Sequence, residues 1–438
     1  MKKCIYALVL AGLMLLSASC SDRSSILKVY NWADYIDETV LDDFEIWYQE
    51  QTGEEITVVY QTFDINETML SRIEKGQEDY DVVCPSEYII ERMMAQNLLL
   101  PIQRDFGSTP NYIDQNLSPF IVNSFEKVNC GDKRALDYTV PYMWGTTGIL
   151  YNAKYVSDQE ASSWDILVNP KFYDKIFVKD ACRDVYTTLL LYLKNDEIQA
   201  GLLDKDSIMY HYNEEYMLLV ENFLKMVAPG VAGWEADFGK EQMTQEKGYV
   251  NLSWSGDAKW AYDEAKTLGV DLRYRIPQEG ANVWFDGWVI PKYAKNTKAA
   301  SYFINFLCRS DIAIRNMDAT GYVGVLASPE ILEAMTDESL DYTVNASYFF
   351  GPGMADNVKL NHMFYPDSVD ISRCTLMHDW GEDTPRLIEM WTRVKGDNAS
   401  GRTYVLVIIL LLAMVGLPIF NKIKKKNRKK SRRRKRRR

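Results

Sequence analysis

Along the middle of the chain, short apolar runs alternate with longer stretches whose apolar positions recur at helical spacing. The short runs are rich in β-branched and aromatic residues, which is typical of buried strands. Strands are predicted over 27–32, 56–61, 81–84, 149–151, 176–179, 250–254 and 272–276. Helices are predicted over 38–51, 68–75, 88–96, 299–308 and 384–394. This alternation indicates an α/β fold, in which ligands bind at the carboxyl ends of the strands.

The start of one helix can be predicted in more detail. Asp64 and Glu67 stand three residues apart, directly before the helix predicted over 68–75. This is the spacing of a capping box, in which two side chains accept hydrogen bonds from backbone N–H groups of the first turn. We therefore expect this helix to begin with a side-chain cap.

The N-terminus has the pattern of an export signal. Lys2 and Lys3 precede an apolar stretch over 5–16, and small residues lead to Cys20. Residues 16–20 read Leu-Ser-Ala-Ser-Cys and resemble a bacterial lipobox, although the leucine stands one place earlier than usual. We expect a signal peptide of lipoprotein type over 1–19, a lipid on Cys20 and a tether over 20–26. Ordinary signal cleavage is the alternative.

The C-terminus carries a second uncharged apolar segment, over 404–420. Its length is close to the roughly 17 residues that a membrane-spanning helix needs. Residues 421–438 hold 14 Lys and Arg and no acid, so we expect a transmembrane segment followed by a basic cytoplasmic tail. The alternative is a buried helix with a nucleic-acid-binding arm, but the segment is apolar on every face.

The rest of the chain is strongly acidic. The formal net charge is −11, and without the last 18 residues it is about −25. Such a body repels nucleic acid and attracts small cations, although solubility alone is the plainer reading. Three His and seven Cys, without HExxH or CxxC, leave little for a zinc site or a Ser-His-Asp triad. We expect neither metal nor cofactor.

Acidic and aromatic residues stand side by side where several predicted strands end. The pairs include Asp34 beside Trp32 and Tyr35, and also Glu87–Tyr88, Asp184, Trp254 with Asp257, and Trp284 with Asp286. Singly, such acids are often helix caps and such Trp residues are often core. Together they suit a linear diamine, because carboxylates pair with its ammonium ends and aromatic faces attract its charge. Paired acids are also typical of glycoside hydrolysis, and sequence spacing leaves that alternative open.

Several motifs identify a family. Residues 29–32, 66–69, 85–86, 141–145, 183–185 and 321–322, with Trp284 and Asp286, resemble the periplasmic spermidine/putrescine-binding proteins of ABC transporters. The resemblance covers nearly all of 27–397. It implies two α/β lobes, joined by hinge strands, that close on the ligand in the periplasmic-binding-protein (Venus-flytrap) manner. The first lobe would comprise 27–138 and 286–325, and the second 139–285 and 326–397.

The resemblance also implies the ligand-binding residues. Aromatic side chains would line the site, namely Trp32, Tyr35, Tyr88, Trp254, Trp284 and Tyr322. Three carboxylates would pair with the ammonium groups, namely Asp34, Asp184 and Asp286. Ser86 would orient one end, and Asp257 is counted with these residues. Ala181, Met377 and Asp257 resemble the putrescine-preferring members, whereas Tyr88 and Trp284 resemble the spermidine type, so putrescine is only slightly favoured.

The expected protein is therefore a monomeric solute-binding receptor and not an enzyme. It would capture a polyamine outside the cytoplasmic membrane, in the periplasm, and deliver it to the permease subunits of an ABC transporter. The chain has no P-loop, so ATP hydrolysis would belong to a partner. Two alternatives are a membrane-tethered sensor or permease accessory, and an extracytoplasmic hydrolase that uses acids such as Asp34 and Asp286.

Overall fold

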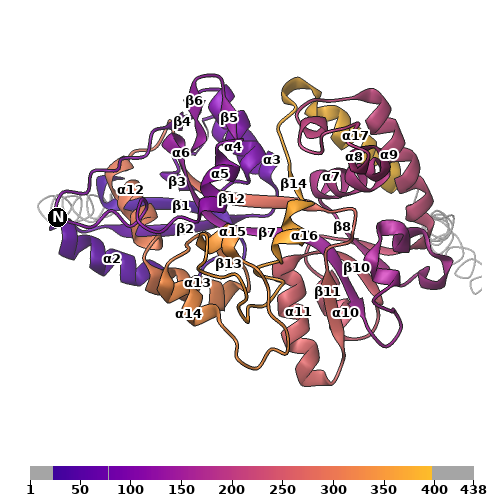
Figure 1. Ribbon diagram of the computed structural model, residues 1–438. Helices are drawn as coiled ribbons and strands as arrows, with labels where there is room; N and C mark the ends of the chain where they lie inside the picture. Colours follow the sequence, from indigo (N-terminus) through magenta and orange to yellow (C-terminus); the bar gives the residue numbers. More distant parts are fainter. Residues whose placement is uncertain (1–22, 77, 397–438) are drawn as a thin grey trace, which may run out of the picture.

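The computed structural model describes residues 23–76 and 78–396. Figure 1 shows two α/β lobes that lie side by side and share one sheet, whose central path follows the order β2-β1-β3-β12-β7-β10-β8-β9. The two-lobe α/β architecture expected from the sequence is confirmed.

The first lobe is built on parallel strands. β1 (Ile26–Trp32) pairs with β2 (Thr57–Phe63) on one side and with β3 (Val82–Val83) on the other. The connecting and covering helices are α2 (Thr39–Thr52), α3 (Asn66–Glu74), α4 (Glu87–Ala95), α12 (Thr297–Leu307) and α13 (Ser310–Thr320). Their apolar faces are buried against the sheet, so β1 and β3 end inside the molecule and not at its surface.

The second lobe repeats this arrangement. β10 (Val250–Trp254) runs parallel to β8 (Ile176–Lys179), which pairs in turn with β9 (Val231–Glu235). β11 (Leu272–Arg275) pairs with β7. The main helices are α7 (Cys182–Leu193), α9 (Glu214–Val227), α11 (Ser255–Leu268) and α17 (Thr384–Gly396).

Two long strands, β7 (Thr139–Asn152) and β12 (Asn282–Pro291), pass between the lobes. They pair antiparallel with each other, and every residue in both is buried. In the second lobe β7 also pairs with β10 and β11. In the first lobe β12 also pairs with β3 and β4 (Leu99–Leu100). The register shifts between Asp286 and Gly287, and such a bulge re-aims the side chain beside it.

Shorter elements complete the described chain. They are β5 (Asn129–Cys130), β6 (Lys133–Arg134), β13 (Val323–Gly324), β14 (Thr375–Leu376), α5 (Pro119–Phe125), α6 (Ala135–Tyr138), α8 (Asn195–Gln199), α10 (Gly239–Thr244), α14 (Pro329–Met335), α15 (Ser347–Phe350) and α16 (Ser368–Ser372). β14 pairs with the start of β12, so the chain returns to the junction of the lobes before α17.

All the predicted strands and helices occur, with ends that differ by a few residues. The strand predicted over 149–151 is the last part of the much longer β7. The predicted capping box is wrong. The helix α3 begins at Asn66, and the residue at its N-cap position is Ile65, whose side chain makes no capping hydrogen bond. Instead the Glu67 carboxylate accepts a hydrogen bond from the Tyr88 hydroxyl at 3.4 Å, so a tertiary partner replaces the local one.

The two predicted membrane-directed segments, 1–19 and 404–420, lie outside the described residues, as do Cys20 and the basic tail over 421–438. Within the described part of the chain, no helix has the length and apolar character needed to cross a membrane. The five cysteines found there, Cys84, Cys130, Cys182, Cys308 and Cys374, are all free.

Gly145 on β7 allows a close approach that a larger residue would prevent. A Cβ atom there would lie 2.5 Å from Cζ2 of Trp284 and 2.7 Å from Oγ of Ser255. We expect Gly145→Ala to lower the free energy of unfolding, measured in urea, by about 1–3 kcal/mol, because the indole has to move within a packed junction. Gly396→Ala, whose added Cβ atom would have no neighbour within 4 Å among the described residues, should change it by less than about 0.5 kcal/mol. Equal stability of both variants would contradict this packing.

Candidate ligand-binding site

Most of the predicted site residues lie at the junction of the two lobes, where strands end and helices begin. Trp254 is the last residue of β10, Ser86 precedes α4, and Asp184 and Asp257 lie in the first turns of α7 and α11. Helix N-termini favour negative charge, which suits these carboxylates. We call the group the acid–aromatic cluster: Tyr35, Ser86, Asp184, Trp254, Asp257, Trp284, Asp286 and Tyr322.

Asp286 is held at the centre of this cluster by hydroxyl donors. Oδ1 accepts a hydrogen bond from the Ser86 hydroxyl at 2.7 Å, and Oδ2 accepts one from the Tyr35 hydroxyl at 2.8 Å. The residue is only 6% exposed. Burial raises the pKa of Asp286 to about 6, against the effect of these two hydrogen bonds. The first lobe thus supplies both donors to a carboxylate on a strand that passes between the lobes.

Asp184 faces the cluster from the second lobe and is 8% exposed. Its Oδ1 accepts a hydrogen bond from the Asn282 amide at 2.6 Å. Burial raises the pKa of Asp184 to about 7; the charge of Asp286 adds to the rise, whereas Trp254, Lys179 and Asn282 oppose it. Among the described residues, no Lys, Arg or His forms an ion pair with Asp184 or Asp286. Two buried carboxyl groups therefore lie near each other without a cation that pairs with them.

Three aromatic rings of the cluster pack edge to face, and Tyr35 at one end of the group contacts Asp286. The Tyr35 and Tyr322 ring centroids are 5.2 Å apart, and those of Trp284 and Tyr322 are 5.6 Å apart. The Nε1 atom of Trp284 is buried without a hydrogen-bond partner in the described structure. Rings in this arrangement present π faces to which a cation is attracted.

Tyr88 and Ser86 are linked through Asn66. Its Nδ2 atom donates to the Ser86 hydroxyl and to the Tyr88 hydroxyl, at 3.0 Å in each case. Asn66 therefore fixes two predicted site residues at once. Residues 66–69 carry a family motif, but the motif alone does not predict this role of Asn66.

Glu87 is a third buried carboxyl group that was not predicted as a site residue. It is fully buried; Oε2 accepts the Phe285 N–H at 3.0 Å, and Oε1 has no partner in the described structure. Burial raises the pKa of Glu87 well above its usual range, and the charges of Asp286 and Asp184 add to the rise. The acid–aromatic pair Glu87–Tyr88 at the end of a predicted strand was the sequence signal for it, but Glu87 was not counted among the ligand-binding residues.

Asp257 differs from Asp184 and Asp286 because it already forms ion pairs with lysine side chains. The Lys179 ammonium group bonds to Oδ2, and Nζ of Lys240 lies 3.5 Å from Oδ1. Burial works to raise the pKa of Asp257, but Lys179 and Lys240 hold it below its usual value. Tyr322 also donates its hydroxyl to Oδ1, at 3.1 Å. The predicted contact of Asp257 with the ligand remains a prediction.

Asp34 and Trp32 lie at the margin of the cluster. Asp34 is exposed and has a backbone φ of 53°, in the left-handed region. The Trp32 ring packs on Phe63, with centroids 4.5 Å apart. Their predicted ligand contacts also remain predictions.

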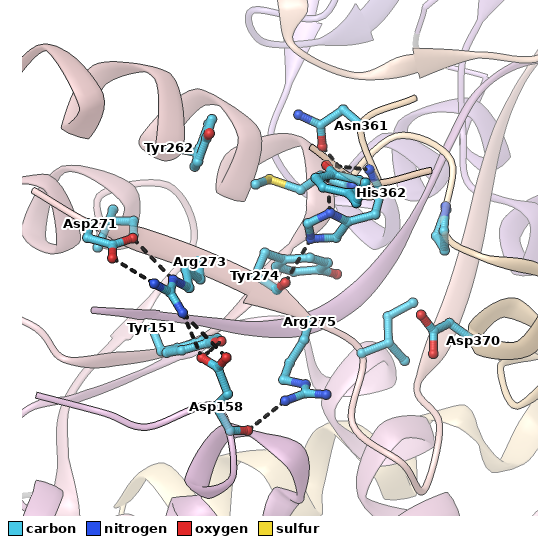
Figure 2. Close-up of a pocket in the computed structure, with 15 residues that line it drawn as sticks. Tyr151, Asp158, Tyr262, Asp271, Arg273, Tyr274, Arg275, Asn361, His362 and Asp370 are labelled. Atoms are coloured by element: carbon cyan, nitrogen blue, oxygen red, sulfur yellow. Dashed lines mark hydrogen bonds and ion pairs between the residues drawn. The ribbon is translucent and has the colours of Figure 1, made fainter. Parts of the chain in front are cut away.

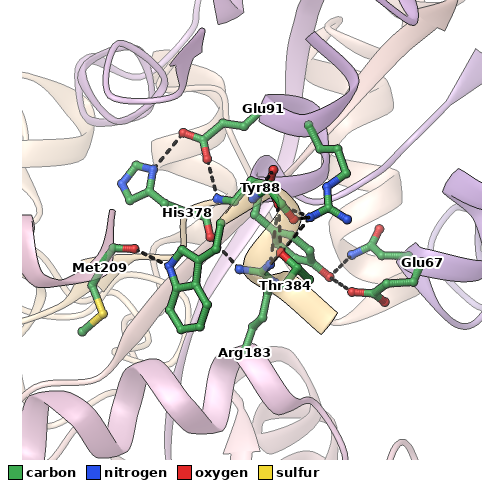
Figure 3. Close-up of polar contacts among 12 residues, drawn as sticks. Glu67, Tyr88, Glu91, Arg183, Met209, His378 and Thr384 are labelled. Carbon is green, nitrogen blue, oxygen red and sulfur yellow. Dashed lines mark hydrogen bonds and ion pairs between the residues drawn. The ribbon is translucent and has the colours of Figure 1, made fainter. Parts of the chain in front are cut away.

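A polar bridge joins the two lobes beside the cluster (Figure 3). Glu91 on α4 lies 2.8 Å from Nδ1 of His378 and accepts the Asp379 N–H at 2.7 Å. The neighbouring Arg92 donates to Asp379 Oδ1 at 2.6 Å. His378 and Asp379 precede α17, which packs in the second lobe, so these contacts connect the lobes directly.

Arg183 carries this bridge to the site. Its guanidinium carbon lies 4.4 Å from the centroid of the Tyr88 ring, and its Nη2 donates to the Thr384 hydroxyl at 2.8 Å. Because Arg183 precedes Asp184 on α7, the position of a predicted ligand carboxylate is tied to the contact between the lobes.

A separate cavity of about 430 Å³ lies along β11 in the second lobe (Figure 2). There Nε2 of His362 lies 3.0 Å from the Tyr274 carbonyl oxygen, and Arg275 donates to the Asp158 carbonyl oxygen at 2.6 Å. None of the residues that line it belongs to the acid–aromatic cluster.

The fold and the site define a class of protein. The sequence matches the family model of bacterial extracellular solute-binding proteins over residues 41–360, and the chain belongs to this family. Within it, the chain is 30% identical to the spermidine/putrescine-binding periplasmic protein of Escherichia coli (strain K12) over 346 residues, which is 77% of this chain and 90% of that protein.

Two further likenesses agree with this. The chain is 30% identical over 351 residues to the putrescine-binding periplasmic protein SpuD of Pseudomonas aeruginosa, covering 77% of this chain and 88% of SpuD. It also resembles the crystal structure of the spermidine/putrescine ABC transporter substrate-binding protein PotD from Streptococcus pneumoniae, with a TM-score of 0.63 and 28% identity. That match covers 86% of this chain and all of PotD.

Asp184 should lower the stability of the free protein near neutral pH. Its carboxyl group loses its proton near pH 4 in the unfolded chain, but only near pH 7 in the folded protein. The free energy of unfolding should therefore fall as the pH rises from about 4 to 7. We expect Asp184→Asn to be about 1–4 kcal/mol more stable than wild type at pH 8 and nearly equal at pH 4, by urea unfolding. A variant less stable than wild type at pH 8 would contradict this.

Proposed function

We propose that this protein is a receptor for a linear polyamine, which it binds between its lobes and delivers to an ABC transporter permease. The observation that carries the proposal is the pair of buried carboxyl groups, Asp184 and Asp286, which lack a cationic partner among the described residues and lie among aromatic rings. The names of the relatives, which are spermidine- and putrescine-binding proteins, support the same ligand class.

A diamine suits both the buried carboxyl groups and the aromatic rings of the cluster. A buried carboxylate costs several kcal/mol unless a cation pairs with it, and an ammonium group supplies that cation together with N–H donors. The methylene chain and the ammonium charge are then both stabilised by the faces of Tyr35, Trp284 and Tyr322. Because Tyr35 and Ser86 come from the first lobe and Asp184 from the second, a ligand paired with both acids favours closed lobes.

The remaining parts of the proposal concern the cellular setting. The receptor would act as a monomer at the periplasmic face of the membrane, held there by a lipid on Cys20 and by the segment 404–420. Permease subunits and an ATPase would be separate chains, and we propose no catalytic role for the paired acids. The tethered sensor or permease accessory remains the second candidate for a protein with a basic tail over 421–438.

The choice between putrescine and spermidine depends on neighbouring residues. Ala181, which precedes α7, and the buried Met377 offer no charge to the far amine of a longer ligand. This supports a preference for putrescine.

Calorimetric titration of the purified protein with putrescine and spermidine tests the proposal. We expect one-to-one binding, and we expect Asp286→Ala to weaken it by at least about 100-fold, because one ammonium group loses its buried partner. Glu338→Gln removes an exposed acid from an ion pair with Lys359 and should leave the affinity unchanged. No binding of any polyamine, or unchanged affinity of Asp286→Ala, would contradict the function.

Binding should also release protons. Asp184 and Asp286, with pKa values of about 7 and about 6, are partly protonated near pH 6.5 in the free protein, and the ammonium groups favour their ionised forms. We expect the affinity to rise at least about tenfold between pH 5 and pH 8. At pH 6.5 the heat of binding should differ between phosphate and Tris buffers, and Asp184→Asn should reduce that difference. Identical heats for wild type in both buffers would contradict the proton release.

A further inference from the structure

Lys179, the last residue of β8, is a fully buried lysine at one end of the acid–aromatic cluster. Its ammonium group bonds to Asp257 Oδ2, lies 3.2 and 3.3 Å from the two carboxylate oxygens of Glu235, and donates to the Ala236 carbonyl oxygen at 2.9 Å. The same nitrogen lies 4.3 Å from the centroid of the Trp254 ring.

These surroundings have the chemistry that the cluster would offer to an ammonium group of a polyamine. Two carboxylates pair with the charge, a carbonyl oxygen accepts a third hydrogen bond, and an indole face covers the side. Burial works to lower the pKa of Lys179, but Asp257 and Glu235 hold it above its usual value. The protein therefore keeps a charged ammonium group of its own at this position.

This position is continuous with the rest of the cluster. Asp257 accepts the Tyr322 hydroxyl, Tyr322 packs on Trp284 and Tyr35, and the Tyr35 hydroxyl reaches Asp286. The charge of Lys179 also favours the ionised form of Asp184. One row of side chains thus runs from the carboxyl groups without a cation to the carboxylate that Lys179 neutralises.

We propose that Lys179 is a specificity-determining residue, whose ammonium group fills one cation position of the cluster and so restricts the ligand to a short diamine. The inference rests on the proposed function and adds a further cause, beside Ala181 and Met377, for a preference for short ligands. A third ammonium group in a longer ligand would meet Lys179 at Asp257 and repel it, whereas a diamine needs only Asp184 and Asp286. Lys240, 3.5 Å from the other oxygen of Asp257, adds to the repulsion.

A purely structural role makes a different prediction. Glu235 also accepts the Gly239 N–H at 3.0 Å and the Asn251 amide at 3.3 Å, so the ion pair with Lys179 stabilises this part of the second lobe. Its loss would lower the free energy of unfolding and weaken all ligands to a similar extent. The ratio of affinities for a triamine and a diamine is therefore the informative measurement.

The test compares dissociation constants of putrescine and spermidine for wild type and Lys179→Met by calorimetry. Wild type should prefer putrescine, and Lys179→Met should shift the ratio toward spermidine by about tenfold or more, because Asp257 loses its closer ammonium partner and can pair with the third ammonium group. Lys179→Met/Asp257→Asn removes that carboxylate and should restore the ratio of wild type. Lys171→Met, which removes an exposed lysine paired with Glu160 in the same lobe, should leave it unchanged.

The possible results separate the role of Lys179 from the proposed receptor function. If Lys179→Met does not fold, Lys179→Met/Glu235→Gln also removes the buried charge of Glu235, and the same shift is expected because Asp257 again lacks the Lys179 ammonium group. A ratio within about twofold of wild type in the folded variant, or a preference of wild type for spermidine, overturns the role of Lys179 and leaves the receptor function standing. If wild type binds neither ligand, the receptor function and this inference fail together.

Discussion

The organisation of this protein depends on the burial of two carboxyl groups, Asp184 and Asp286, at the junction of its two lobes. Negative charge in such a place costs several kcal/mol without a counter-ion, and hydrogen bonds from Ser86, Tyr35 and Asn282 offset only part of this. In the free protein the raised pKa values of Asp184 and Asp286 keep the pair partly protonated near neutral pH. In the proposed function a dication would remove this penalty, and ligand binding would then be coupled to closure of the lobes.

The backbone places these groups with few elements. β7 and β12 pass between the lobes, and the bulge at Asp286 lies where they cross the junction. The N-termini of α4 and α7 bring Ser86 and Asp184 to the same point from opposite lobes. The bridge from Glu91 to His378 then connects closure to Arg183, the neighbour of Asp184. Lys179 adds a fixed positive charge at one end of the acid–aromatic cluster. Without it, Asp257 would be a third buried carboxylate like Asp184 and Asp286.

The sequence pattern predicts the α/β class and the strands β1, β2, β3, β8, β10 and β11, which are short runs rich in apolar and β-branched residues. It predicts only the end of β7 and misses β9. It does not predict β12 as a strand, since the buried Asn282 and Asp286 interrupt its apolar run. Family motifs predict Asp184, Asp286, Tyr35 and Trp284. They could not predict that Asp257 is already paired, because Lys179 lies 78 residues away and ends a strand pattern where a lysine is usually solvated. The burial of Glu87 was missed for the same reason, since its partner Phe285 lies on β12, 198 residues later in the chain.

In the proposed function the ligand is the missing counter-ion of Asp184 and Asp286. Carboxyl carbon NMR of aspartate-labelled protein measures this directly, with Asp184→Asn and Asp286→Asn used to assign the two signals. In the free protein both groups should titrate near pH 6 to 7, in agreement with pKa values of about 6 and about 7. With bound putrescine both should remain ionised down to about pH 5. Titration curves that do not change when putrescine binds would contradict the account.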